Sequence, residues 1–389
     1  MKSLKPILIS ALLLITAACG GGGGDSTPAP ATTTVAGVAA AGIIKGGTVK
    51  VFAPYSSLTG ADKKQIGTDV QTSLTTGEYS VNLGTYTGPV IIEVTGGQYE
   101  DEATGTLTTI PTSAPLRAVA VSSTGTVNVA VTPLTELAAK QAATLAGAGV
   151  KLTDASINQA NAQVSDLFKV DIIATSPLDA SAPLVGTQAQ KDYTLALAAV
   201  SQLANDPALL ETTLTNLANN ITAAGSMDAT VVGNIATALS DFVTLNVNNS
   251  TGITVVPDTL QNLGTTSFTL TVALTGTGVK GVDAIINLPV GVTISADSTG
   301  APLDGVLTKL TSGTNFSLEG SVATAGTLHV IFNVADQGFT MAAGDILTIK
   351  TDVAAGQAAP TASQFTLGSA TKVMDANGAV VSGASLSLK

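Results

Sequence analysis

The chain has 389 residues, a formal net charge of −11, 11% charged residues and 3% aromatic residues. The acidic balance argues against a nucleic-acid partner, because phosphates are bound by lysine and arginine, and against charge-driven adhesion to anionic lipid head groups. Hydrophobic residues make up 45% of the chain, which is enough to fill cores, so we expect two or three folded domains and not global disorder.

Residues 1–18 have the pattern of a secretory signal peptide. Lys2 and Lys5 precede an apolar run from Ile7 to Ile15, and small residues lead up to Cys19. The run is much shorter than the roughly 20 residues that a membrane-spanning helix needs. Cys19 is the only cysteine, so the sequence predicts neither a disulfide nor a cysteine-based metal site.

The segment from Thr16 to Cys19 resembles the lipobox of bacterial lipoproteins. The resemblance implies that Cys19 is the lipid attachment site and becomes the new N-terminus. Thr16 departs from the leucine that usually lies three residues before the cysteine, and the alternative is cleavage near Ala18 that releases a soluble secreted protein. Gly20 after the cysteine predicts, by analogy with enteric lipoprotein sorting, an anchor in the outer membrane, on its periplasmic or its outer side.

Residues 19–34 are predicted to form a tether. The five glycines from Gly20 to Gly24 are followed by proline, alanine and threonine, which have nothing to bury. A Gly-rich segment behaves as a flexible coil. The glycine run has no strand before it and no Lys-Ser/Thr after it, so it does not fit a phosphate-binding loop.

Residues 35–132 alternate apolar and polar residues with the period of β-strands. The alternation is clearest at Val49 and Val51, and at Tyr79, Val81 and Leu83, and predicts an antiparallel β-sandwich. The stretch from Gly46 to Val51, followed by Thr68-Asp69 and by Thr76 to Val81, resembles the carboxypeptidase-regulatory-like group of prealbumin-type sandwiches. That resemblance implies a structural spacer or a binding module.

Glu100, Asp101 and Glu102 form the densest acidic cluster of the chain. One interpretation is a calcium site, because hard cations take clustered carboxylates. The other is a solvated hairpin edge that discourages strand-to-strand aggregation. We favour the second interpretation.

Residues 133–247 are predicted to form an all-α unit. Thr132 followed by Pro133 is typical of a helix start, and a second start lies near Thr153 and Asp154. Apolar stripes at helical spacing predict five helices, which form either a bundle core or a groove for a partner, and we favour the core. The sandwich followed by the segment from Val131 to Ala138 is similar to uncharacterised exported proteins of Gram-negative bacteria, which supply no activity.

A polar segment from Asn246 to Pro257 is predicted to be a linker, and residues 258–389 return to β periodicity. The spacing of the strands predicts a second sandwich of jelly-roll or immunoglobulin-like type. Four stretches resemble cohesins and the related carbohydrate-binding-module superfamily, namely Val279 to Val292, Leu328 to Val334, Gly344 to Ile349 and Met374 to Ala379.

The cohesin resemblance implies a dockerin-like protein partner or a polysaccharide ligand. The chain has no Trp, and its C-terminal third has no Tyr, so the aromatic platform of many carbohydrate modules is missing. Asp375 to Gly378 looks like the start of an EF-hand, but no Glu follows Glu319, so we expect a hairpin turn there.

The sequence offers little catalytic chemistry. His329 is the only histidine, so a serine or cysteine triad would depend on this one residue, and a zinc site with several histidines is excluded by count. Paired carboxylates of a glycosidase are not excluded by count, which leaves a hydrolase as a remote alternative. We therefore expect no catalytic, cofactor-binding or metal-binding residues and no cofactor.

These observations together predict a multidomain chain with a β-sandwich, a helical unit and a cohesin-like β-sandwich. The predicted function is that of a non-enzymatic, lipid-anchored protein of a Gram-negative cell envelope that displays binding or scaffolding β-modules. The alternative is a carbohydrate-binding or dockerin-binding component of polysaccharide degradation.

Overall fold

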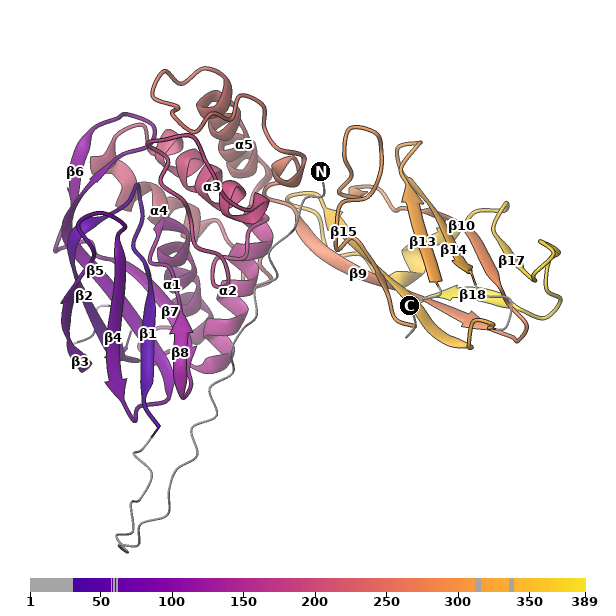
Figure 1. The fold of residues 1–389 in the computed structure, drawn as a ribbon, viewed down its shortest axis with the longest axis horizontal. Coiled ribbons are helices and arrows are strands. Elements are labelled where there is room, and N and C mark those ends of the chain that lie inside the picture. The colour runs from indigo at the N-terminus through magenta and orange to yellow at the C-terminus, as the bar shows by residue number, and fades with distance from the viewer. Residues whose placement is uncertain (1–30, 57, 59, 61, 312–315, 336–338) are drawn as a thin grey trace, which may run out of the picture.

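The computed structural model describes residues 31–56, 58, 60, 62–311, 316–335 and 339–389. The predicted signal peptide, Cys19 and the glycine run lie outside the described residues. Figure 1 shows two bodies. The first contains strands and helices packed together, and the second is a β-sandwich that lies beside the helices of the first. Within the described ranges, no helix is long and apolar enough to cross a membrane.

The first body begins with two β-sheets. The strand β1 (Thr33–Val38) is central in a three-stranded sheet, antiparallel to β4 (Glu78–Gly84) and parallel to β8 (Gly125–Asn128). The second sheet contains, in spatial order, β3 (Lys64–Gln71), β2 (Lys45–Ala53), β5 (Gly88–Glu100) and β6 (Leu107–Ile110), with β7 (Leu116–Ser122) also paired to β5.

The burial of each strand follows its place in the fold. In β4 the predicted positions Tyr79, Val81 and Leu83 are buried and their neighbours are exposed, because one face of this strand meets the core and the other meets solvent. β7 is buried along almost its whole length, since α1 and α2 pack against it. A strand covered in this way has no solvent face and reads as a nearly continuous apolar run.

Five α-helices follow the sheets. They are α1 (Pro133–Ala146), α2 (Asp154–Phe168), α3 (Gln188–Ala204), α4 (Leu210–Asn219) and α5 (Ala229–Thr244), with a 3-10 turn η1 (Pro207–Leu209) before α4. The two predicted helix starts are confirmed: the side chains of Thr132 and Thr153 accept hydrogen bonds from the backbone N–H of Thr135 and Ser156. Each cap satisfies a backbone donor that the first helical turn leaves free.

The sheets and helices share one hydrophobic core. Leu134, Leu137 and Val164 of the helical stripes belong to the same buried cluster as Val81 and Ile92 of the sheets. The stripes are therefore buried as expected, but in a core shared with the sheets and not in that of a separate helical bundle. Helices without this apolar contact would be marginal, because helical stability in proteins comes mainly from tertiary packing.

The segment after α5 is packed against the first body and is not a solvated linker. Asn246 and Asn248 each donate a side-chain hydrogen bond to the Ala103 carbonyl at 2.9 Å. Thr251 is buried, and Leu260 of η2 (Asp258–Leu260) lies in the first core. The expectation failed here because asparagine amides, which make a segment look soluble, also bond backbone carbonyls.

The second body consists of two five-stranded sheets around a separate core. One sheet contains β13 (Phe316–Ser321), β14 (Thr327–Val334), β10 (Gly281–Asn287), β16 (Thr366–Leu367) and β17 (Lys372–Met374). The other contains β11 (Val292–Thr293), β12 (Leu307–Lys309), β15 (Gly344–Val353), β9 (Thr266–Thr275) and β18 (Ser385–Leu388). Leu270, Ile286, Phe332 and Ile349 meet between the sheets, and a short 3-10 turn, η3 (Ala362–Gln364), lies before β16.

The tail between β17 and β18 forms the expected turn. The backbone N–H of Asp375 donates to the Ala379 carbonyl at 2.9 Å, and Asp375 Oδ1 accepts from the backbone N–H of Asn377 at 2.8 Å. This side-chain bond is an Asx turn, which explains the Asp and Asn residues of the segment without a metal. The chain as a whole is rich in β-structure, with several sheets and one group of helices.

Candidate functional site

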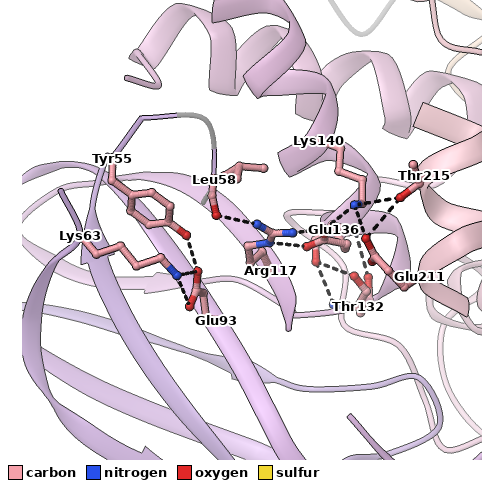
Figure 2. A network of polar contacts seen from close by, with 11 residues as sticks. Tyr55, Leu58, Lys63, Glu93, Arg117, Thr132, Glu136, Lys140, Glu211 and Thr215 are labelled. Atoms are coloured by element: carbon pink, nitrogen blue, oxygen red, sulfur yellow. Dashed lines mark hydrogen bonds and ion pairs between the residues drawn. The ribbon is translucent and has the colours of Figure 1, made fainter. Parts of the chain in front are cut away.

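The segment from Val131 to Ala138 joins the sheets to the helices through a buried ion pair (Figure 2). Arg117 of β7 donates from Nε to Glu136 Oε2 at 2.9 Å and from Nη2 to Glu136 Oε1 at 2.7 Å. The third arm of the guanidinium donates to the Leu58 carbonyl at 3.0 Å. Burial raises the pKa of the Glu136 carboxyl, while the facing Arg117 guanidinium and the Lys140 ammonium oppose that rise.

Further contacts extend this network across the helices. Lys140, one turn after Glu136 on α1, places Nζ 3.4 Å from Glu136 Oε1 and 2.7 Å from Glu211 Oε1 of α4. The hydroxyls of Thr132 and of Tyr193 on α3 are 2.8 Å apart and hydrogen-bonded. The segment that the sequence singled out is therefore the place where β7, α1, α3 and α4 are fastened together.

A second polar group lies beside this network on β5. Glu93 accepts bonds from Lys63 Nζ at 2.8 and 3.1 Å and from the Tyr55 hydroxyl, and burial is the main cause that raises the pKa of Tyr55. Lys63 Nζ also lies 4.7 Å from the centre of the Tyr55 ring, a cation–π distance. Each carboxylate in Figure 2 thus faces a cation at close range. That arrangement fastens the elements together.

His329 of β14 lies on the outer face of the second body, as the alternation of this strand predicts. Its Nε2 is 2.6 Å from Asp283 Oδ1 on the neighbouring strand β10, and both side chains are more than one third exposed. Within the described part of the chain, no serine, threonine or cysteine side chain is hydrogen-bonded to this imidazole. The histidine and aspartate therefore lack the nucleophile that a triad requires.

The acidic cluster after β5 differs from both sequence interpretations. Glu100 is exposed, but Asp101 and Glu102 are buried, so the cluster is not a solvated edge. Asp101 Oδ2 accepts from the Ser201 hydroxyl of α3 at 2.8 Å, and Glu102 Oε1 accepts from the Gly42 N–H at 2.6 Å. Burial raises the pKa of Glu102 to about 7. The two carboxylates bind the β5–β6 turn to the β1–β2 connection and to α3.

No metal-binding group is formed by this cluster or elsewhere in the part of the chain that the structure describes. No three or more His, Cys, Asp or Glu side chains converge there in a way that could hold a metal ion. Asp101 is occupied by Ser201 and by the N–H and hydroxyl of Thr104, at 2.8 to 2.9 Å. Its Oδ1 therefore serves the turn and its Oδ2 binds the turn to α3.

A cleft of about 1180 Å³ lies between the two bodies. The end of α2 and the start of α3 form one wall, and the loop before β12 together with β15 forms the other. Six aspartates and two lysines line it: Asp166, Asp171, Asp192, Asp297, Asp304, Asp352, Lys169 and Lys350. Clefts at domain boundaries are common ligand sites, and the charged residues of this one are mainly acidic, among apolar neighbours such as Val121 and Leu303.

Lys169 of the cleft follows the last residue of α2. It ends α2 in a left-handed backbone conformation with a φ of 55°, which costs a residue other than glycine roughly 1 kcal/mol or more. Its Nζ lies 2.9 Å from Asp352 Oδ1 on β15, and both side chains are less than one tenth exposed. Burial raises the pKa of Asp192, which lies on another part of the wall.

Sequence reasoning missed both buried ion pairs. Arg117 is the only arginine of the chain and lies in the apolar run from Leu116 to Val121, and an isolated charge in such a run is a signal of a buried partner. Lys169 gave no comparable signal, because its partner Asp352 is far away in the sequence. Cys19, the predicted lipid attachment site, lies outside the described residues.

Comparison with known proteins gives no further assignment: no protein family, no curated protein and no solved structure matches the chain.

Proposed function

We propose that this chain is a non-enzymatic, lipid-anchored protein of the bacterial cell envelope that presents its C-terminal β-sandwich as a binding or scaffolding module. The observation that carries the proposal is the single cysteine, Cys19, directly behind a signal-peptide pattern. Glu93, Glu136 and Asp101 are engaged in contacts that hold the fold together. This supports a role in binding over a role in catalysis.

The position of the first strand supports an anchored body close to the membrane surface. β1 begins at Thr33, so only a short segment separates Cys19 from the folded chain. The proposed outer-membrane anchor would therefore hold the first body near the lipid head groups.

The test is metabolic labelling with a palmitate analogue in a Gram-negative host, with and without globomycin. We expect the wild-type protein to be labelled and found with the outer membrane, its precursor to accumulate with globomycin, and Cys19→Ser to be unlabelled and soluble. Thr16→Leu restores the usual lipobox and serves as the matched variant, with equal or faster processing. A membrane-bound Cys19→Ser protein, or an unlabelled wild type that matures normally, would contradict the anchor.

One observation favours a second candidate, a polysaccharide or dockerin-like partner for the second body. On the outer face of β10 and β14, Ile285 and Ile331 are half-buried and lie beside the polar residues Asp283 and His329. An apolar centre with a polar rim is the composition of a protein interface.

A glycan array and a dockerin pull-down with the full chain test this candidate. The comparison variant is Ile331→Glu, and the control is Val290→Glu, which changes a fully exposed valine outside this face. We expect binding that Ile331→Glu lowers at least tenfold and Val290→Glu leaves unchanged. Absence of binding in both assays contradicts the candidate.

A further inference from the structure

The two bodies are joined by polar contacts and not by a shared apolar core. The buried apolar side chains of the first body and of the second body form separate clusters. The connection between them is short and anchored: Leu263 is buried in the first core, and the Gly264 N–H donates to the Leu167 carbonyl of α2 at 2.5 Å. β9 then begins at Thr266, so no free spacer separates the bodies.

Asp352 of β15 is the centre of the polar contacts. It is paired with Lys169 of α2, and it accepts hydrogen bonds from Asn262 Nδ2 at 3.2 Å and from Thr265 Oγ1 at 3.1 Å. The Ser295 hydroxyl of the second body also donates to it. This carboxylate therefore contacts the helix, the connection and the sandwich at once.

Asp166, on the same turn of α2, makes the second contact between the bodies. Its Oδ2 accepts from the backbone N–H of Ser267 on β9 at 2.5 Å, and its Oδ1 accepts from the Ser267 hydroxyl. The Nζ atom of Lys350 on β15 lies 3.6 Å from Asp166 Oδ1, and the Nζ atom of Lys169 lies 3.5 Å from the same oxygen. Each body thus contributes one aspartate and one lysine to the boundary: Asp166 and Lys169 from the first body, and Asp352 and Lys350 from the second.

We propose that Asp166, Lys169 and Asp352 form an interdomain lock that holds the sandwich in one orientation and sets the width of the cleft. A swing of the sandwich would break the Lys169–Asp352 ion pair, the Asp166–Lys350 pair and the hydrogen bonds of Asp166 to Ser267 together. The three residues also line the cleft, so its walls and the lock are the same side chains. The left-handed backbone of Lys169 fixes where this cation is placed. The inference does not depend on the proposed lipid anchor.

Spin-label distance measurements test the lock on the full chain. In a Cys19→Ser background no other cysteine is present, so Thr212→Cys on α4 and Ser382→Cys in the sandwich, both exposed, carry the two labels. We expect one narrow distance distribution for this protein. In Lys169→Gly we expect the distribution to widen at least twofold, because glycine fits the left-handed backbone but removes the cation.

Asn205→Gly is the matched control. Asn205 ends α3 in the same left-handed conformation, with a φ of 56°, and makes no contact with the second body among the described interactions. Its substitution should leave the distribution unchanged. The double variant Lys169→Met/Asp352→Asn, which removes both charges together, should widen the distribution as Lys169→Gly does. A distribution that is already broad in the starting protein, or one that stays narrow in both Lys169 variants, overturns the lock.

Discussion

Arg117 on β7 and Glu136 on α1 form a two-pronged ion pair between sheet and helix, and Glu136 is completely buried. The pair lies in the core that both layers share. An ion pair in such a place contributes less to net stability than to the choice of one packing geometry, because burial of both charges is costly. The pair therefore fixes the position in which α1 packs against β7.

Removal of one partner should therefore be far more harmful than removal of both. Arg117→Leu leaves the buried Glu136 carboxylate with the Lys140 ammonium, 3.4 Å away, as its remaining counter-charge, and we expect it to lower the free energy of unfolding by about 3 kcal/mol. Arg117→Leu/Glu136→Leu should cost clearly less. Urea unfolding measures both variants.

The control is Lys50→Met, which breaks the exposed Lys50–Asp69 pair and should change the free energy of unfolding by about 1 kcal/mol or less. Equal losses for the single and double variants contradict this account.

The stability of the first body should depend on the protonation of Glu102. Burial raises the pKa of Glu102 to about 7 in the folded protein, from an ordinary value of 4.5. The folded state therefore holds a proton that the unfolded state has released, and its contribution to stability is complete below pH 4.5 and is lost as the pH rises through 7. The difference amounts to about 3 kcal/mol.

Urea unfolding at pH 5.0 and pH 7.5 measures this effect against Glu102→Gln. Glutamine keeps an oxygen for the Gly42 N–H but does not titrate, so we expect the variant to gain stability relative to wild type as the pH rises between these values. Asp62→Asn is the matched control, because that carboxyl is exposed and its pKa is lowered chiefly by the Ser56 backbone N–H. If wild type and Glu102→Gln change in parallel, the buried carboxyl does not titrate in this range.

Two glycine-to-alanine substitutions should have opposite effects. A Cβ atom at Gly37 of β1 would lie 1.8 Å from the Val129 carbonyl oxygen, so the backbone must move apart, and we expect a loss of about 2–3 kcal/mol. Gly233, exposed on α5, has open space around it, and alanine there should add about 0.5–1 kcal/mol by improving helix propensity. Thermal unfolding measures both. A stabilised Gly37→Ala protein would show that β1 is not held as described.

Sequence patterns predicted the elements whose causes are local. The Thr132 and Thr153 caps start helices where they were expected, and the alternation of Tyr79, Val81 and Leu83 identifies a strand with one buried face. These signals depend on residues within a few positions of one another. They therefore remain readable without knowledge of the tertiary fold.

Contacts between distant residues were not predictable in the same way. Asp101 looked solvated because its partner Ser201 lies 100 residues away, and Lys169 meets Asp352 across an even longer interval. Thr33 and Thr34 have the composition of a tether, yet they begin β1 because β4 and β8 supply hydrogen-bond partners on both sides. The composition of a segment shows that burial of its polar groups would be costly. It does not show whether the fold supplies hydrogen-bond partners that offset this cost.

The parallel pairing of β1 with β8 determines how the protein responds to mechanical load. Thr33 lies opposite Gly125 and Ala36 opposite Asn128, and the chain leaves β8 toward α1 at the end away from Thr33. If the chain is pulled before Thr33 and held after Asn128, the two forces therefore act along β1 and β8 in opposite directions. In this shear geometry the hydrogen bonds of β1 to β8 share the force and must rupture together, whereas a hairpin pulled open from one end loses them singly. We therefore expect β1 to resist this tension more strongly than a strand that is peeled from one end.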